Sequence, residues 1–259
     1  MISVITPIYN TPTDILARTW RSLKKQKYTD WEWVVWDDSP NEYAWRQVYG
    51  FCADERYKIR MFRSHVSSGI IGQVKQQAFM LGRGNILVEL DHDDELTSDA
   101  LQKINDAFSD GAVDFVYSNW SEINQQGESC RYPEGWAFGY GSEYYDKKYK
   151  LWVMRAPEIN STTLSHIVSA PNHVRAWRSI SYHLIGGHDP SLRVADDYDL
   201  VVRTLTAENY NYKHIDKLLY LQHIHSGTAQ RVHNKEIQDN VATLSAKYKE
   251  QIEAKYGPV

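Results

Sequence analysis

Short apolar stretches alternate with amphipathic, helix-like segments through the first 117 residues of the chain. The apolar stretches are too short for typical helices, and the segments between them carry apolar residues three and four positions apart. The predicted strands are Ile2–Ile5, Trp31–Trp36, Lys58–Phe62, Ile86–Leu90 and Val113–Tyr117, and the predicted helices are Thr13–Lys25, Glu42–Cys52, Ile71–Leu81 and a fourth capped by Thr97 and Ser98. This alternation predicts an α/β fold with a mostly parallel sheet covered by helices on both faces.

The pattern loosens between Ser118 and Asn172, where Tyr, Trp, Gly and Ser are frequent, and we predict irregular strands and loops there. Regular elements are predicted again at His173–Trp177 (strand), Ser179–Leu184 (helix), a helix from Asp196, a strand at Tyr212–Tyr220 that continues to His225, and a long amphipathic helix capped by Asn234. No repeat or linker interrupts the chain. We therefore predict a single domain over 1–259, with halves at 1–117 and 118–233 and a C-terminal helix at 234–259.

Composition excludes several classes of protein. The net charge of −4 gives no reason to expect binding to nucleic acid or to an anionic membrane. Cys52 and Cys130 form neither a disulfide framework nor a metal spacing, which fits a reducing compartment. We see no signal peptide and no apolar run of about 18 residues that could span a bilayer, and so expect a cytoplasmic protein.

Polar side chains follow three of the predicted strands, at Tyr9-Asn10, at Asp37-Asp38 and at Asp91–Asp94. The carboxyl ends of parallel strands share one edge of a sheet, so these groups should converge there. Neighbouring carboxylates disfavour each other's ionisation unless a cation lies among them. We therefore predict a hard divalent cation, Mg²⁺ or Mn²⁺, at Asp91 and Asp93. The alternative is an acidic turn that only caps the next helix.

Five sequence motifs, in order, resemble those of the GT-A nucleotide-sugar glycosyltransferases of the large inverting family 2. They span residues 2–231 and read VITPIYN, VWDDSP, LVELDHDDEL, GGHDPSLRVADDYDLVVRTL and HIHSGTAQR. They are similar to the family's opening strand and donor turn, its V-D-D-G-S turn, its D-x-D segment, its G-G-F-D-E…E-D segment and its R-x-H-x-x-S motif. The resemblance implies a GT-A (Rossmann-like) sheet, with a nucleotide-sugar-binding half at 1–117 and an acceptor and catalytic half at 118–233.

The chain departs from the family pattern at four places. SSGIIGQVKQQAF stands where the family has N-x-G-x-x-x-A-R-N. Asp196 replaces the first Glu of the E-D pair, His188 replaces the usual Phe, and His223 stands where Arg is frequent.

The resemblance assigns the donor site to the first half of the chain. It implies that Pro7 and Tyr9 line the base pocket and that Asp38 accepts a hydrogen bond from the base. Lys75 is a candidate for the diphosphate, although a solvated helix face would also explain it. His92 is grouped with this site, although strand alternation would turn its side chain away from Asp91 and Asp93.

The resemblance also distributes the metal and catalytic roles. Asp91, Asp93 and the distant His225 would hold Mn²⁺ or Mg²⁺ beside the diphosphate of a UDP-, GDP- or dTDP-sugar. Asp197, the second acid of the E-D pair, would be the catalytic base that deprotonates the acceptor hydroxyl. Asp94 and Glu95 are expected to support the loop rather than bind metal, and Asp199 to be structural.

The acceptor surface is the least specific prediction. Apolar faces of sugars stack on aromatic rings, so the candidates are Trp120, Asn172 and Trp177, although core packing is a common role for any one tryptophan. The acceptor would be a hydroxyl of a glycan or of a lipid-linked glycan.

Two other functions remain open. A sugar-1-phosphate nucleotidyltransferase would need a glycine-rich basic loop after the first strand, which TPIYNTPTD lacks. A non-catalytic nucleotide- or glycan-binding module on the same fold would not need Asp197 and His225 together with the acidic segment.

Overall fold

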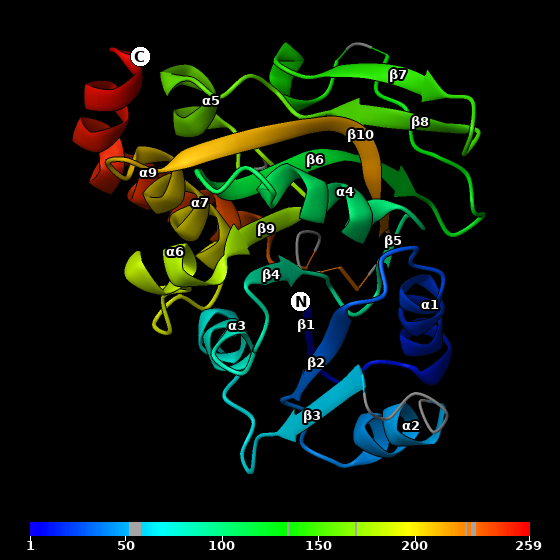
Figure 1. Cartoon of the computed structure of the whole chain (residues 1–259). Coiled ribbons are helices and arrows are strands. Elements are labelled where there is room, and N and C mark those ends of the chain that lie inside the picture. Colours follow the sequence, from blue (N-terminus) through cyan, green and yellow to red (C-terminus); the bar gives the residue numbers. More distant parts are fainter. Residues whose placement is uncertain (52–57, 134, 169, 226, 229–231) are drawn as a thin grey trace.

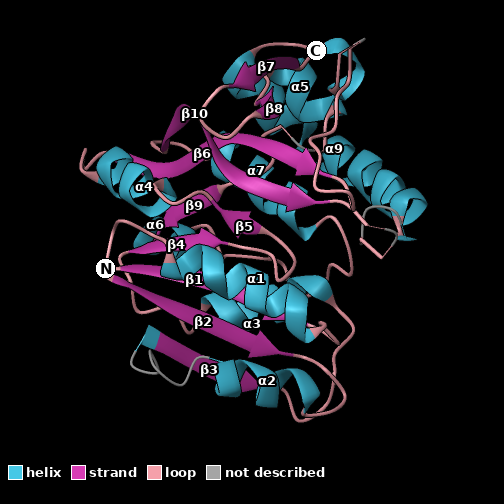
Figure 2. Ribbon diagram, turned by 90° about the vertical axis from the view of Figure 1, so that its right-hand side faces the viewer, coloured by secondary structure: helices cyan, strands magenta, loops and turns pink. Residues whose placement is uncertain are grey.

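The computed structural model describes residues 1–51, 58–133, 135–168, 170–225, 227–228 and 232–259. The chain forms one large twisted sheet in the order β3-β2-β1-β4-β9-β6-β10-β5, with a β7–β8 hairpin attached to β6. Figure 2 shows the strands stacked from β3 at one end of the molecule towards β10 and the hairpin at the other, with helices in front and behind. Both halves of the chain thus contribute to a single sheet.

The first half confirms the predicted alternation of strands and helices. The strands β1 (Ile2–Ile8), β2 (Trp31–Asp37), β3 (Ile59–Arg63) and β4 (Ile86–Glu89) pair in parallel, and the connecting helices are α1 (Thr13–Lys24), α2 (Tyr43–Phe51) and α3 (Ile71–Phe79). Strand β1 is longer than predicted because Ile8 still pairs with Asp37, so Thr6 and Pro7 do not end it. Cys52, the predicted last residue of the second helix, lies outside the described residues.

The second half contains more regular structure than predicted. The remaining elements of the chain are β5 (Glu95–Leu96), α4 (Ala100–Phe108), β6 (Val113–Ile123), a 3₁₀ turn (Ala137–Gly139), β7 (Ser142–Asp146), β8 (Leu151–Arg155), α5 (Ser161–His166), β9 (Arg175–Arg178), α6 (Ser179–Leu184), α7 (Asp196–Thr206), β10 (Asn211–His223) and α9 (Asn234–Tyr256). Figure 1 shows the hairpin and α5 above β6 and β10. The stretch predicted as irregular thus includes the end of β6, the hairpin and α5.

Strand β6 begins at Val113, as predicted, and runs in the same direction as β4, but the two strands do not pair with each other. Strand β9 lies between β4 and β6 and is antiparallel to both, while β10 runs parallel to β6. This insertion places Arg175, at the start of β9, beside the carboxyl end of β4.

Two predicted helix caps also differ, because Asp99 rather than Thr97 or Ser98 precedes α4, and His233 rather than Asn234 precedes α9.

A close approach of α3 to the segment before α7 brings the two halves together. The amide nitrogen of Gly72 donates to the carbonyl oxygen of Leu192 at 3.0 Å. A Cβ atom at this glycine would lie 2.1 Å from the carbonyl oxygen of Asp189, so any larger residue would push α3 away. On the same face, Phe79 of α3 stacks on Tyr182 and contacts Trp177 edge-on. This packing holds α3, and with it Lys75, against β9 and the start of α7.

Candidate active site

The acidic segment after β4 is held through its backbone by α1. The guanidinium of Arg18 donates to the carbonyl oxygen of Asp93 at 2.6 Å. The hydroxyl of Thr19 lies 2.8 Å from the carbonyl oxygen of His92 and 2.9 Å from that of Asp94. The carboxylates are therefore carried on a turn whose backbone is already fixed.

Asp93 and His225 are brought together from positions far apart in the sequence. The Oδ2 atom of Asp93 lies 2.8 Å from the Nε2 atom of His225. Burial opposes the charge on Asp93, but His92 and His225 outweigh it and lower the pKa of this carboxyl. The two residues predicted to hold a metal thus lie side by side, and Ser226 and Ala229–Arg231 of the late motif lie outside the described residues.

Asp91 points in a different direction from Asp93. Its Oδ2 atom lies 3.4 Å from the Nε2 atom of His173, and its side chain is about a third exposed. Among the described residues, no three His, Cys, Asp or Glu side chains converge as a ready-made metal site. The Nδ1 atom of His92 lies 3.9 Å from Asp93, so the expected outward orientation of His92 is wrong, because β4 ends at Glu89 and strand alternation does not continue into the turn.

Asp94 and Glu95 tie the acidic segment to β10. Asp94 is buried, and its carboxylate accepts from the hydroxyl of Tyr220 at 2.8 Å and from the amide of His223 at 2.7 Å. Burial, together with the charges of Asp93 and Asp91, raises the pKa of Asp94 well above its usual range. Glu95 lies 2.9 Å from the imidazole of His223. Both acids occupy the supporting positions expected for them.

At the neighbouring strand ends, the carboxylate of Asp38 binds the chain itself. It accepts from the hydroxyl of Ser67 and the amide of Ser68, each at 3.0 Å. Asp38 thus orders the loop before α3, a role that no sequence pattern indicated. Pro7 is half-buried at the end of β1, and Tyr9 is 53% exposed, so its ring is free to meet a ligand.

A buried network of charges connects α3, β4, β9 and α7. The Nζ atom of Lys75 lies 2.6 Å from Glu89, and the Nε atom of Arg175 lies 2.8 Å from the other oxygen of Glu89. The Nη1 atom of Arg175 donates to Asp197 at 3.0 Å. Lys75 is therefore paired with carboxylates and buried, rather than lying on a solvated helix face.

Glu89 and Arg175 are the members of this network that the sequence-based prediction missed. Both lie in short, largely buried strands, and an ionised side chain in such a strand needs a buried partner. Arg175 is 1% exposed and Glu89 is fully buried. A charged residue within a strand predicted to be buried was therefore the available signal.

Asp197 and Asp196 begin α7 but have opposite properties. Burial opposes the charge on Asp197, but Arg175 and Lys75 outweigh it and lower the pKa of this carboxyl. The side chain remains about a third exposed, so the ionised carboxylate can reach a substrate. Burial raises the pKa of Asp196 to about 7, and its Oδ2 atom makes no hydrogen bond to the described residues. The structure thus distinguishes an accessible, ionised acid from a buried one.

His173 connects the base side of the site to the acidic segment. Its ring stacks on Tyr220 at a centroid distance of 4.3 Å. Burial, with the charge of Arg175, lowers the pKa of His173 to about 4, so the imidazole is neutral near pH 7. The negative charges of Asp197 and Asp91 both act on the guanidinium of Arg175. Asp91, Asp93, His225 and Asp197 are therefore grouped around one end of β4 and β9.

The predicted acceptor residues do not share a surface. Trp120 and Trp177 are each 1% exposed, and the indole nitrogen of Trp177 donates to Thr204 at 3.1 Å. The structure places both tryptophans in the core, where neither ring offers a face to a sugar. Asn172 is half-buried and donates to the side chain of Gln222 at 3.2 Å.

Asp199 is structural, as expected, and binds Arg203 and Tyr248.

The sequence of residues 3–162 matches the model of glycosyl transferase family 2. The chain belongs to this family. It is 26% identical to an Escherichia coli chondroitin synthase over 226 residues, which cover 87% of this chain and 29% of that protein. It is also 24% identical to WcaA of Escherichia coli K12, which is named for colanic acid biosynthesis. The match extends over 230 residues, which cover 89% of this chain and 75% of WcaA.

The fold is shared with a solved structure of Staphylococcus aureus TarS in complex with UDP-GlcNAc. The TM-score is 0.69 at 18% sequence identity, with 98% of this chain and 71% of the other covered. This likeness shows the GT-A type of fold expected for the family. Within the described residues, no helix is long and apolar enough to cross a membrane.

Proposed function

We propose that this family 2 domain is a metal-dependent, inverting glycosyltransferase that uses a UDP-sugar as donor. The proposal is carried by one observation: the Asp93–His225 pair and the ionised, accessible Asp197 lie around one end of β4 and β9. The chondroitin synthase and WcaA, both named for polysaccharides, support a glycan or lipid-linked glycan as acceptor. TarS, solved with UDP-GlcNAc, supports a uridine nucleotide.

The donor set suits Mn²⁺ or Mg²⁺. Asp93 supplies an ionised oxygen ligand and His225 a nitrogen ligand, a combination that Mn²⁺ accepts. Burial raises the pKa of Asp94, and the negative charges of Asp93 and Asp91 raise it further; a cation would offset these two charges. When bound, the metal would supply charge neutralisation on the leaving diphosphate. Asp91 is placed to help orient the donor beside that ion.

The residues of this chain would carry out the rest of the reaction. Asp197 takes the proton from the acceptor hydroxyl as its oxygen forms a bond to the anomeric carbon. The bond from that carbon to the diphosphate oxygen breaks on the opposite face, and its electron pair leaves with the nucleoside diphosphate. Arg175 holds Asp197 ionised until the proton arrives. Tyr9 and Pro7 would contact the base, with Asp38 shaping the loop beside it.

Replacing Asp93 by alanine should abolish metal-dependent binding of the donor. We expect UDP-sugars with Mn²⁺ to raise the melting temperature of the wild-type protein, because a ligand that binds only the native state stabilises it. A thermal screen of UDP-, GDP- and dTDP-sugars, with and without Mn²⁺, measures this effect and selects the donor. Asp106→Ala, on the exposed face of α4, is the matched control. Equal stabilisation in EDTA, or in the Asp93 variant, would show that the metal assignment is wrong.

A further inference from the structure

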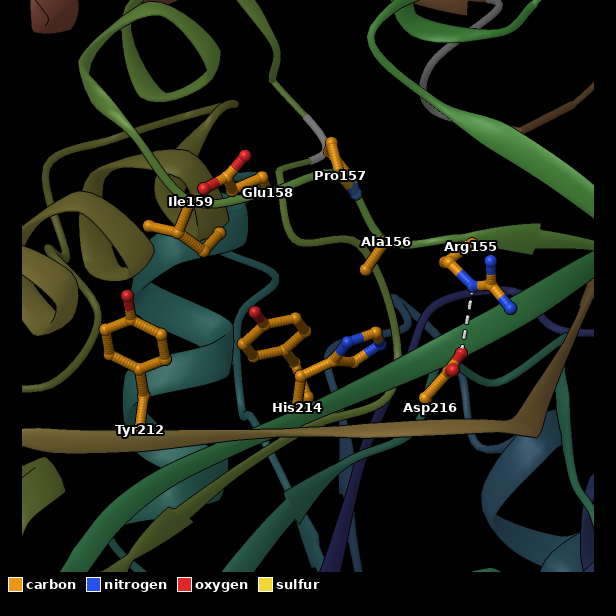
Figure 3. Close-up of a pocket in the computed structure, with 9 residues that line it drawn as sticks. Arg155, Ala156, Pro157, Glu158, Ile159, Tyr212, His214 and Asp216 are labelled. Carbon is orange, nitrogen blue, oxygen red and sulfur yellow. Dashed lines mark hydrogen bonds and ion pairs between the residues drawn. The ribbon is translucent and has the colours of Figure 1, made fainter.

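A hollow on the sheet lies apart from the residues assigned above. It is lined by residues of β10 and by the segment that follows β8, and it has a volume of about 500 Å³. Figure 3 shows Tyr212, His214 and Asp216 rising from β10 towards the segment 155–159. These three residues are spaced two apart, so they share one face of the strand. We call this hollow the β10 pocket.

The side chains of the β10 pocket are held in place before any ligand arrives. The side chain of Asn119 donates to Asp216 at 2.8 Å, and its oxygen lies 2.8 Å from the Nε2 atom of His214. That oxygen also accepts from the amide of Ala156 at 3.1 Å. Arg155 donates to Asp216 at 3.0 Å, as the dashed line in Figure 3 marks. A preformed arrangement of this kind reduces the entropy that a ligand would lose on binding.

Several polar groups in the β10 pocket keep unused hydrogen-bonding capacity. The carboxylate of Glu158 makes no hydrogen bond or ion pair within the described part of the chain. Tyr117 is 4% exposed, and its hydroxyl has no hydrogen-bond partner among the same residues. Because the oxygen of Asn119 is only an acceptor, the Nε2 atom of His214 carries the proton and Nδ1 remains an acceptor. These groups leave donors and acceptors in the pocket that a bound ligand can use.

The chemistry of the β10 pocket favours an uncharged ligand with many hydroxyl groups. The pocket is lined by one cation, Arg155, and two carboxylates, Glu158 and Asp216, so it does not select a phosphate. Burial lowers the pKa of His214, which keeps this imidazole neutral. The ring of Tyr212 is 37% exposed and can stack on an apolar face. Donors, acceptors and an aromatic ring together match a saccharide unit.

The floor of the β10 pocket is next to the residue that holds the proposed base. Tyr117 pairs with Arg175 across β6 and β9 and with His214 across β6 and β10. Neighbouring strands lie about 5 Å apart, so the pocket begins one strand away from Arg175. We propose that the β10 pocket binds a saccharide unit of the acceptor glycan beyond the sugar that reacts. This inference rests on the proposed function and gives it a second acceptor contact.

Direct binding of oligosaccharides tests the proposal. The probes are cellohexaose, maltohexaose, chitohexaose and chondroitin hexasaccharide, titrated by calorimetry into the full chain. We expect at least one hexasaccharide to bind, and Tyr212→Ala and Glu158→Gln each to weaken that binding by about five- to tenfold, from loss of stacking or of a charged acceptor. Tyr49→Ala, the same change at another exposed tyrosine, on α2 at the far end of the sheet, should have no effect.

Binding of UDP with Mn²⁺ is measured on the same samples and should be unchanged in all three variants. Failure of all four hexasaccharides to bind, or equal binding by the wild type and Tyr212→Ala, would overturn the pocket assignment while leaving UDP binding to support the proposed function. Oligosaccharide binding without any UDP binding would contradict the proposed function and leave the saccharide site standing.

Discussion

Replacing Asp197 by asparagine is expected to lower the turnover of the UDP-sugar by about 10²- to 10⁴-fold, the usual contribution of a general base. Asparagine keeps the size of the side chain but cannot accept the proton of the attacking hydroxyl. Because Asp197 is bound by Arg175 and not by the Asp93–His225 pair, the dissociation constant for UDP with Mn²⁺ should change little. Release of UDP from the donor selected by the thermal screen measures the rate, and calorimetry measures the binding.

A matched control is Asp189→Asn, which removes the same charge from the segment that precedes α7. The carboxylate of Asp189 is bound by Ser191 and takes no part in the network of Arg175. We expect this variant to turn over donor as the wild type does. Unchanged turnover in Asp197→Asn would show that Asp197 is not the catalytic base, even if donor binding remained.

Replacing Arg175 by methionine is expected to lower the free energy of unfolding by about 3–5 kcal/mol, because it leaves the buried Glu89 with one partner fewer. Methionine fills a similar volume, so the loss comes from the uncompensated charge. Denaturation by urea measures this change. Arg178→Met, on the same strand, is the control, because among the described residues Arg178 donates only to backbone carbonyl groups.

The same Arg175 variant should also alter the pH dependence of turnover. Arg175 lowers the pKa of Asp197, so the wild type should lose activity only when the pH falls below the usual range of an aspartate. Without the guanidinium, the pKa of Asp197 rises and the acid limb moves to higher pH. Arg175→Lys, which keeps the charge, should bring the acid limb part of the way back to its position in the wild type. A variant that loses stability but keeps the wild-type pH profile would limit Arg175 to a structural role.

The sequence predicted the first half of the fold well because its signals are local. Each strand there is a short apolar run followed by a turn and an amphipathic helix, and parallel pairing of such units follows general rules. The placement of β9 could not be predicted in this way. Its antiparallel insertion between β4 and β6 depends on contacts between segments about 90 residues apart in the sequence, such as Arg175 with Glu89.

The sequence predicted the site residues that lie in recognisable motifs. It did not predict those whose role depends on burial. Asp93, His225 and Asp197 carry motif signals, and the structure shows the pairing of the first two and the accessible position of the third. Glu89 and Arg175 gave only the weak signal of a charge in an apolar strand. Trp120 and Trp177 were predicted at the acceptor surface but lie in the core, because aromatic content does not distinguish a sugar-binding face from a packed core.

The anomeric configuration of the first sugar released from the donor tests the central claim most directly. Proton NMR of the turnover of an α-linked UDP-sugar, chosen by the thermal screen, with Mg²⁺ reports the anomer before it equilibrates in solution. Direct displacement with Asp197 as base predicts that the α-linked donor first yields the β anomer, and that none forms when EDTA removes the metal. Initial release of the α anomer would contradict an inverting site built on Asp197.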